Sequence, residues 1–207
     1  MNAEEFGGIP FIGAVFGSEN GQPTNHFATA WVVASMHGNV IVSAAHILIG
    51  RNAADLMFAP GYANGHAPHG WYHMHSSATT AAWQQDQNIN DDFCLMKVGE
   101  DLQSALGSLN LLVDEGPQAC DVIGYPDGQA SPVHATVQAR WFMPGQQFVM
   151  DCGGYPNGTS GAPWVAENGA FGLIGGYQQG GDSPSISYSP CFGAAISDLY
   201  SSYTATC

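Results

Sequence analysis

A single serine, Ser160, stands among closely spaced glycines in the stretch Asp151-Cys152-Gly153-Gly154-Tyr155-Pro156-Asn157-Gly158-Thr159-Ser160-Gly161-Ala162-Pro163-Trp164. The pair Asn157-Gly158 predicts a turn, because both residues tolerate positive φ. After the serine, the chain becomes apolar from Ala162, as a strand that enters a core does. A hydroxyl on such a turn can face a substrate while neighbouring amides converge to stabilise an oxyanion. The alternative is a Gly/Ser loop without chemistry, since a short motif alone carries false positives.

Two apolar segments upstream contain residues that can activate this serine. A serine is a weak nucleophile until a base takes its proton, and the base needs a third group to orient it. The segment Ile41-Val42-Ser43-Ala44-Ala45-His46 ends in a histidine that can be the base. The segment Asp91-Asp92-Phe93-Cys94-Leu95-Met96-Lys97-Val98 begins with two acids, either of which can be the orienting group.

At these three places the chain resembles the chymotrypsin-like serine proteases. The family's T-A-A-H motif is similar to Ser43–His46, its D-I-A-L-L-K-L motif to Asp92–Val98, and its G-D-S-G-G-P motif to Gly158–Pro163. The order His, Asp, Ser is also the order in that family. Three motifs in one order, spread over most of the chain, carry more weight than any one of them.

The fold class follows from composition and from this resemblance. Abundant glycine (27 residues) and short apolar runs rich in Val, Ile and aromatics indicate an all-β architecture. The resemblance implies two packed six-stranded antiparallel β-barrels with a C-terminal helix. It implies an N-terminal barrel over residues 1–110 that carries His46 and Asp92, and a C-terminal barrel over 111–207 that carries Ser160.

Local patterns predict individual elements. The expected strands cover residues 11–16, 27–35, 40–43, 133–142, 148–150 and 171–177. A polar loop is expected over 17–26, and a C-terminal helix over 194–203.

The resemblance also assigns a role to each candidate catalytic residue. Ser160 would attack the scissile carbonyl, and His46 would take its proton and pass it to the leaving amine. Asp92 would orient His46, because alignment on the apolar run that follows favours it over Asp91. The backbone amides of Gly158 and Ser160 would form the oxyanion hole.

Substrate preference is inferred from the presumed pocket. Trypsin-like members carry Asp six residues before the serine, where this chain has Gly154, so a basic P1 residue is not expected. Glutamyl-specific members carry a His on the pocket-wall strand, which pairs with the substrate backbone, and Leu173–Tyr177 has none. A small or apolar floor favours an uncharged P1 residue. The expected substrate-binding residues are Tyr155, Gly175, Gly176 and Tyr177.

The sequence therefore predicts a secreted serine endopeptidase that acts as a monomer on protein or peptide substrates, without a metal or cofactor. A glutamyl-specific endopeptidase is one alternative, since Pro60-Gly61-Tyr62 and Pro68-His69-Gly70-Trp71 resemble bacterial glutamyl-endopeptidase-like members. A catalytically silent binding module on the same fold is another, because fold does not imply function.

Net charge excludes two classes of partner. Lys and Arg total 3 against 17 acids, a formal charge of −14, which argues against binding to nucleic acid or to an anionic membrane surface. No run of eighteen apolar residues predicts a membrane span. No signal peptide is visible, and the start is typical of a mature domain with an added initiator Met.

The five cysteines allow two disulfides and one free thiol. Cys94 lies in an apolar strand pattern and is expected to be a buried free thiol. The resemblance places Cys152 and Cys191 on either side of the specificity pocket, so they are the favoured pair, with Cys120 and Cys207 remaining.

Four histidines, His66, His69, His73 and His75, fall within ten residues. His73 and His75 would share one strand face and could bind a metal with a third ligand. No acid or cysteine lies nearby in the sequence, so solvated or hydrogen-bonded histidines are the favoured interpretation.

Overall fold

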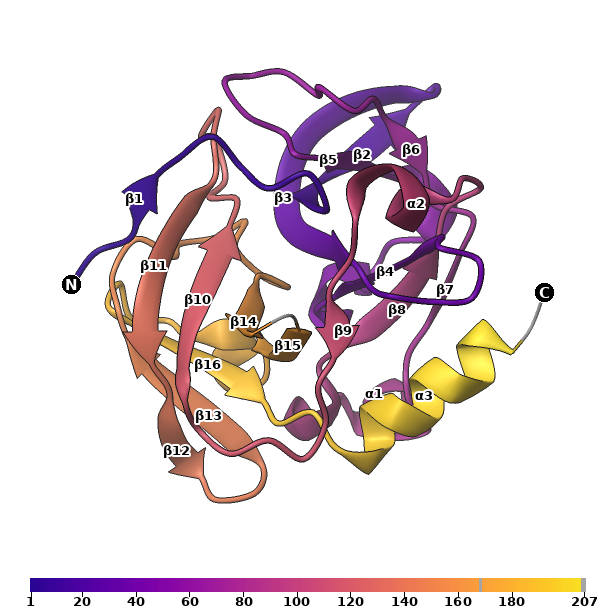
Figure 1. Cartoon of the computed structure of the whole chain (residues 1–207). Helices are drawn as coiled ribbons and strands as arrows, with labels where there is room; N and C mark the ends of the chain where they lie inside the picture. Colours follow the sequence, from indigo (N-terminus) through magenta and orange to yellow (C-terminus); the bar gives the residue numbers. More distant parts are fainter. Residues whose placement is uncertain (168, 206–207) are drawn as a thin grey trace.

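Three sheets make up the fold of the computed structural model, which describes residues 1–167 and 169–205 (Figure 1). One sheet comes from the first half of the chain and the other two mainly from the second half. The prediction of an all-β, two-barrel architecture with a C-terminal helix is confirmed at the level of fold class.

The first-half sheet has seven strands. In the order in which they lie side by side, they are β6 (Tyr72–His73), β5 (Leu56–Pro60), β2 (Ile12–Glu19), β3 (Gln22–Val32), β4 (Val40–Ser43), β8 (Cys94–Lys97) and β7 (Ser76–Ala78).

The hairpin of β2 and β3 corrects the prediction of a loop over 17–26. Glu19 pairs with Gln22, so the turn consists of Asn20 and Gly21, both at positive φ (53° and 74°). Two-residue hairpin turns favour Asn-Gly because both positions require positive φ. The polar residues at the start of β3 are exposed, so this part of the hairpin lacks the apolar alternation that reveals a strand.

The second half forms two sheets. The six-stranded sheet has the order β1 (Glu4–Glu5), β11 (Val133–Gln138), β10 (Ala119–Gly124), β14 (Pro163–Ala166), β15 (Gly169–Leu173) and β9 (Asn110–Leu111). The three-stranded sheet has the order β12 (Arg140–Met143), β13 (Gln147–Asp151) and β16 (Ile186–Pro190). The strand predicted over 133–142 is therefore divided, since β11 and β12 belong to different sheets.

Helices are few and short. The α-helices are α1 (Ala81–Asp86), α2 (Leu102–Leu106) and α3 (Ala194–Thr204), and 3₁₀ turns cover Ala45–Leu48, Ala53–Asp55 and Ile89–Asp91. A further short turn, Tyr177–Gly180, has left-handed backbone at Gln178 and Gln179. The C-terminal α3 packs against the first half: Ile196 is buried in its core, and the Tyr200 hydroxyl donates to Ala34 O at 2.6 Å (Figure 1). None of the helices in the described residues is long and apolar enough to cross a membrane.

Two apolar clusters fill the two halves. The larger contains Trp31, Phe58 and Leu95, and the smaller contains Phe148 and Trp164, all fully buried. Segments from each half cross to the other, since β1 pairs with β11 and α3 covers the first half. Our division at residue 110 stays a proposal.

The cysteines differ from the prediction. Cys94 is a buried free thiol, as expected, but Cys120, Cys152 and Cys191 are free thiols as well. Burial raises the pKa of both the Cys120 and the Cys191 thiol to about 12. Cys207, the expected partner of Cys120, lies outside the described residues.

The register of β13 and β16 explains why the favoured Cys152–Cys191 bridge is absent. Cys152 follows the end where Asp151 pairs with Ile186, and Cys191 follows the opposite end, where Pro190 pairs with Gln147. Cys191 lies opposite Gln146, so at about 3.4 Å per residue the two cysteines are separated by roughly six residues, about 20 Å. A disulfide needs Cα atoms within about 7 Å of each other.

Candidate active site

The pairing of β4 with β8 brings His46 and Asp92 together. Ser43, the last residue of β4, pairs with Cys94, the first residue of β8. His46 lies three residues after Ser43, in the 3₁₀ turn Ala45–Leu48, and Asp92 lies two residues before Cys94. Because the strands are antiparallel, the residues just beyond these paired ends lie at the same edge of the sheet.

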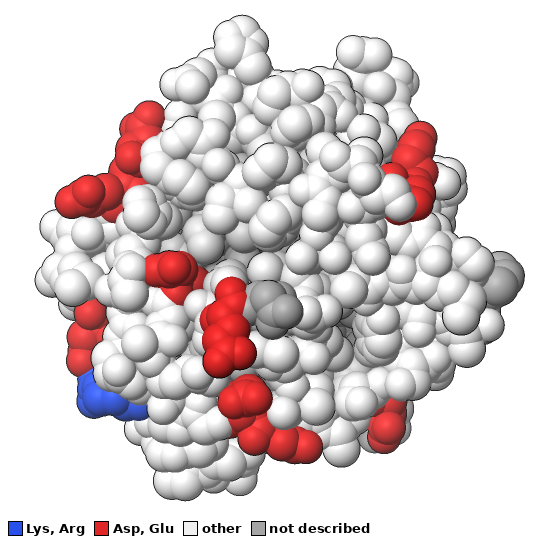
Figure 2. Space-filling view, viewed as in Figure 1, with Lys and Arg blue, Asp and Glu red and all other residues white. Residues whose placement is uncertain are grey.

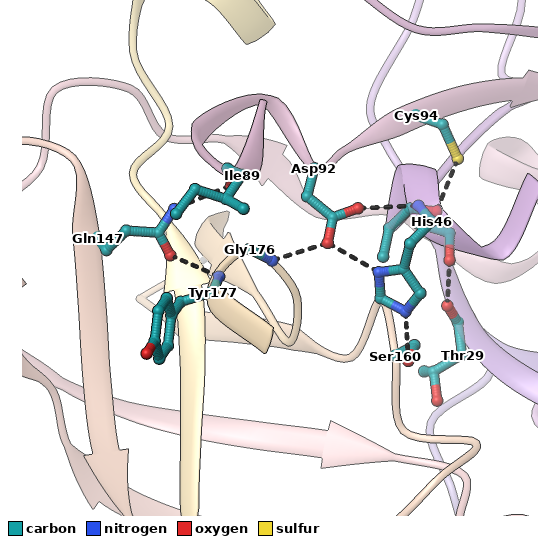
Figure 3. A network of polar contacts seen from close by, with 11 residues as sticks. Thr29, His46, Ile89, Asp92, Cys94, Gln147, Ser160, Gly176 and Tyr177 are labelled. Atoms are coloured by element: carbon teal, nitrogen blue, oxygen red, sulfur yellow. Dashed lines mark hydrogen bonds and ion pairs between the residues drawn. The ribbon is translucent and has the colours of Figure 1, made fainter. Parts of the chain in front are cut away.

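The imidazole of His46 connects an acid to a serine (Figure 3). Its Nδ1 lies 2.7 Å from Asp92 Oδ2, and its Nε2 lies 2.7 Å from Ser160 Oγ. A carboxylate can only accept, so Nδ1 carries the proton in this pair. In the neutral imidazole, Nε2 is then the atom that can accept a proton from Ser160.

The Asp92 carboxylate is fully buried and accepts three N–H groups. Oδ1 accepts from the His46 amide at 2.8 Å, and Oδ2 accepts from His46 Nδ1 and from the Gly176 amide, each at 2.7 Å (Figure 3). A buried charge needs such donors, because its desolvation otherwise costs several kcal/mol. The donors stabilise the anion and hold the imidazole in one orientation.

The neighbouring Asp91 has different partners. Its Oδ2 accepts from Thr80 Oγ1 at 2.6 Å, and the same hydroxyl caps the start of α1 by accepting from the Trp83 amide. The structure therefore has Asp92, not Asp91, beside His46.

Glycine conformation shapes the turn around Ser160. Gly158 and Gly161 have φ of +94° and +86°, a region that side chains rarely adopt. A Cβ on Gly161 would lie 2.2 Å from both Ser43 Oγ and Thr29 O. The turn is therefore in close contact with β3 and the end of β4, and only glycine fits at this contact.

Two amides of this turn are available to a ligand. The Thr159 amide donates to Pro156 O at 3.2 Å, whereas within the described part of the chain the Gly158 and Ser160 amides donate to no protein acceptor. The carbonyls of their peptide units are held: Asn157 O accepts from the Asp127 amide at 2.7 Å, and Thr159 O from the Ala162 amide at 2.9 Å. Because a trans peptide is planar, a fixed carbonyl also fixes the N–H on its opposite side.

Thr29 connects the two halves at the Ser160 turn, and the sequence analysis gave it no role. Its amide donates to Ser160 O at 2.8 Å, and its hydroxyl donates to Gly158 O at 3.1 Å and accepts from the Tyr125 amide at 2.9 Å. Its carbonyl accepts from the buried Ser43 hydroxyl at 2.7 Å (Figure 3). The only signal in the sequence was a threonine within the apolar run of β3, and the structure buries it fully.

A second missed connection runs through Gln147, a fully buried residue of β13. Its Nε2 donates to Ile89 O at 2.9 Å and to Asn90 Oδ1 at 3.0 Å, and its Oε1 accepts from the Tyr177 amide at 3.2 Å (Figure 3). The turn before Asp92 and the segment after Gly176 are thereby joined to one side chain of the second half.

A pocket of about 640 Å³ opens beside Ser160. Its walls are the 154–157 segment, Ile174 and the 179–184 segment, so the predicted Tyr155 lines it. Three other residues expected to bind substrate, Gly175, Gly176 and Tyr177, do not line it. Gly176 donates to Asp92 instead, and the Tyr177 ring packs against Phe142 and Tyr188.

The shape of the 174–181 segment explains this difference. The strand predicted over 171–177 ends at Leu173, and Gln178, Gln179, Gly180 and Gly181 all have positive φ. Two successive left-handed glutamines are uncommon and costly, and such backbone is concentrated at functional sites. Sequence periodicity carries no signal for a turn of this kind.

The pocket walls are acidic rather than basic. Asp127 and Asp182 are exposed lining residues, and no Lys, Arg or His lines the pocket among the described residues. The three cations of the chain have partners elsewhere: Arg140 pairs with Asp151, and Arg51 and Lys97 lie over the rings of Phe27 and Tyr203. On the face of the molecule drawn in Figure 2, acidic side chains are spread out and basic ones are nearly absent.

Cys94 lies near the site as a neutral thiol. Burial and the neighbouring Asp92 charge raise its pKa well above the usual range, and its Sγ donates to Ala44 O at 3.3 Å (Figure 3). It therefore supplies no competing thiolate nucleophile at neutral pH.

The four histidines of the 66–75 segment do not form a cluster of metal ligands among the described residues. Within the described ranges, no three His, Cys, Asp or Glu side chains lie close enough together to hold a metal ion. His69 packs against Gly61, and His75 packs against Gly99.

Comparison with known proteins supports the fold. No family model matches the chain, and no curated protein matches it. Among solved structures, the chain is similar to the protease Anisep from Arthrobacter nicotinovorans, with 20% identity and a TM-score of 0.82 over 99% of this chain and 100% of that one. It is also similar to a Glu endopeptidase, with 14% identity and a TM-score of 0.79 over 99% and 97% of the two chains. A scabies mite inactivated protease paralogue gives 14% identity and a TM-score of 0.75 over the whole of both chains.

The chain thus has the fold of the chymotrypsin-like serine proteases, over its whole length. The resemblance inferred from three short motifs is confirmed at the level of fold. At these identities the likeness establishes the fold alone, and the inactivated paralogue illustrates that activity must be argued from the site.

Proposed function

We propose that the protein is a serine endopeptidase that hydrolyses peptide bonds through an acyl-enzyme on Ser160. The observation that carries this proposal is the continuous hydrogen-bonded chain from Ser160 Oγ through His46 to Asp92, with both contacts at 2.7 Å. A nucleophile, a base and an orienting acid in this geometry are the elements of triad catalysis.

The first chemical step is attack of Ser160 Oγ on the scissile carbonyl. His46 Nε2 takes the hydroxyl proton as the carbon–oxygen bond forms, and the imidazolium is stabilised by the buried Asp92 carboxylate. Nε2 then gives the proton to the leaving amine as the peptide C–N bond breaks. Water, with its proton taken by the same nitrogen, then attacks the acyl carbon. The bond between that carbon and Ser160 Oγ breaks, Nε2 returns the proton to Oγ, and the acid product leaves.

The negative charge of the tetrahedral intermediate is assigned to the amides of Gly158 and Ser160. Their peptide units are held by bonds to the carbonyls of Asn157 and Thr159, so the donors are oriented before substrate arrives. Loss of one such donor costs about 10²–10³ in kcat in comparable sites.

We further propose an uncharged P1 residue, since Gly154, Tyr155 and Ile174 are small or apolar lining residues and the two lining acids, Asp127 and Asp182, are exposed to solvent. We propose that the enzyme acts outside the cell, as a monomer and without a cofactor, on protein or peptide substrates. With 3 Lys and Arg residues in 207, it offers few cleavage sites to trypsin-like enzymes, which suits a protein that works among proteases.

The two alternatives are less well supported. A glutamyl-specific enzyme needs a cationic group in the pocket, whereas the described lining residues include Asp127 and Asp182 and no cation. An inactive binding module on this fold would not need Ser160, His46 and Asp92 in mutual hydrogen-bond contact.

Labelling with a fluorophosphonate probe tests the proposed nucleophile. We expect one adduct by intact mass on the parent protein, located on Ser160 by peptide mapping, and none on Ser160→Ala. Ser185→Ala is the matched control, since it removes an exposed serine near the pocket and should keep the adduct. A folded parent without any adduct would contradict the proposal and favour the binding module.

A further inference from the structure

A second hollow, of about 360 Å³, adjoins the pocket beside Ser160. The two share one lining residue, Asp127, in the loop that follows β10. The remaining walls of the second hollow include Phe16, His26, Tyr62 and Gln129. A substrate chain that leaves the Ser160 pocket past Asp127 therefore reaches this hollow next.

Aromatic rings give the hollow an apolar wall. The Phe16 and Tyr62 rings meet edge to face at 5.1 Å, and His26 packs edge to face on Phe16 at 5.3 Å. The His26 Nε2–H donates to Gln129 O at 2.9 Å, which joins β3 to the loop after β10. Rings of this kind pack against a long aliphatic stem and attract a cation through their faces.

The charge of the hollow is negative. Of the described residues that line it, Asp127 is the one acid, and the other titratable side chains are His26 and Tyr62. The lining includes no Lys or Arg, and the chain as a whole carries a formal charge of −14. An anionic side chain would therefore be repelled here and a cationic one attracted.

The backbone fixes the distance between this hollow and the reacting atoms. Thr29, three residues after His26 on β3, holds the carbonyls of Ser160 and Gly158. The Asp127 amide holds Asn157 O, in the peptide unit that presents the Gly158 N–H. Three strand residues span about 10 Å, so the hollow lies within about three residues of extended substrate from the scissile bond.

The walls of the Ser160 pocket and of the second hollow indicate on which side of the scissile bond the hollow lies. The segment after β15, which the family resemblance assigns to the substrate backbone, contributes Ile174 to the lining of the Ser160 pocket and no residue to the lining of the second hollow. The second hollow is lined instead by β2, β3, Tyr62 and the loop after β10, so it is assigned to the other side of the scissile bond, that of the departing amine.

We propose that this hollow is a subsite for a Lys or Arg side chain within the first three substrate residues after the scissile bond. The aliphatic stem packs on Phe16 and Tyr62, and the cationic end pairs with Asp127. This inference rests on the proposed peptidase function and adds a cationic requirement on the leaving-group side to an uncharged P1 residue.

Quenched fluorescent peptides test the subsite. A reference peptide is varied at each of the first three positions after its cleaved bond, with Arg, Gln or Glu, and kcat/KM is measured for each. We expect Arg to exceed Gln, and Gln to exceed Glu, at one of these positions. In Asp127→Asn, the Arg-to-Gln ratio should fall about two- to five-fold, the worth of one exposed charge pair.

Two further variants assign the preference to the hollow. Tyr62→Leu should also lower the Arg-to-Gln ratio about two-fold, because it removes a ring face. Asp182→Asn is the matched control: it removes an exposed acid from the other side of the Ser160 pocket and should leave the ratio unchanged. A ratio that falls equally in Asp127→Asn and Asp182→Asn would reflect general attraction by the acidic surface and would overturn the subsite.

The outcomes separate this inference from the proposed function. Cleavage of the reference peptide with no preference for Arg at any of the three positions would overturn the subsite and leave the peptidase intact. No cleavage of any peptide, together with no fluorophosphonate adduct, would overturn the peptidase and the subsite with it.

Discussion

The two sides of the candidate active site are built in different ways. His46 and Asp92 belong to the first half, where a regular ladder between β4 and β8 sets their spacing and their side chains make the contacts. Ser160 belongs to the second half, where a turn with two positive-φ glycines presents both the hydroxyl and the backbone amides. One side depends on side-chain chemistry at fixed positions, and the other depends on backbone conformation. Substitutions on the first side should therefore mainly lower kcat, and substitutions on the second side should mainly lower the stability of the turn.

The largest effect is expected on the first side, from Asp92→Asn. The carboxylate accepts three N–H groups with two oxygens, whereas the amide has one oxygen and adds an NH₂ donor. The NH₂ group must then face a donor, which favours the wrong His46 tautomer. We expect kcat to fall about 10⁴-fold, measured with a peptide substrate at neutral pH.

Asp91→Asn is the matched control, one residue away. An asparagine oxygen can still accept from Thr80 Oγ1, so kcat should stay within about two-fold of the parent. Equal losses in the two variants would contradict the assignment of Asp92 as the orienting acid. The assignment would be supported most directly if Asp92→Asn kept the parent's stability in urea while losing activity.

The next effect is expected on the second side, from Gly161→Ala. The new methyl group would lie 2.2 Å from Ser43 Oγ and Thr29 O, at a residue with φ of +86°. We expect the free energy of unfolding to fall by about 3 kcal/mol or more, because the turn must move away from β3. Urea denaturation measures the loss, and the folded fraction should show reduced fluorophosphonate labelling.

Gly50→Ala separates the two causes. Gly50 also has positive φ (+71°), but no atom lies within 4 Å of its added Cβ. Gly50→Ala should lower the free energy of unfolding by about 1 kcal/mol, the cost of positive φ for a residue with a Cβ, and should leave fluorophosphonate labelling unchanged. If Gly161→Ala were no more destabilising than Gly50→Ala, the close contact between the turn and β3 would not hold the nucleophile.

The difference between the two sides also decides what the sequence could predict. The strands that end at His46 and begin after Asp92 are short apolar runs, and β4 and β8 were visible as such. The turn around Ser160 was visible because glycines mark it. The choice of Asp92 over Asp91 came from alignment on the apolar run, and the observed contacts of the two acids agree with it.

The features that the sequence did not predict depend on contacts between distant segments. Thr29 and Gln147 read as ordinary strand residues, and only the folded chain gives them partners 129 and 58 residues away. The favoured disulfide failed because strand register, which no pattern in β16 reveals, separates the two cysteines. The turn that follows β15 was not predicted, because two left-handed glutamines follow a strand that looked continuous.

The smallest effect in this series is expected where the two sides meet, at Thr29. In Thr29→Val the shape of the side chain is kept, but Gly158 O loses its donor and the buried Tyr125 amide loses its acceptor. We expect a loss of about 1–3 kcal/mol in unfolding free energy, the cost of leaving such groups unpaired. Gly158 O belongs to the peptide unit next to the oxyanion amide, so kcat should also fall several-fold while KM changes little. Thr29→Ser keeps the hydroxyl and should restore most of kcat despite losing a buried methyl group. If Thr29→Val lost stability but kept the parent kcat, the bond from β3 to Gly158 would support the fold alone, and the two sides would be coupled only through His46 and Ser160.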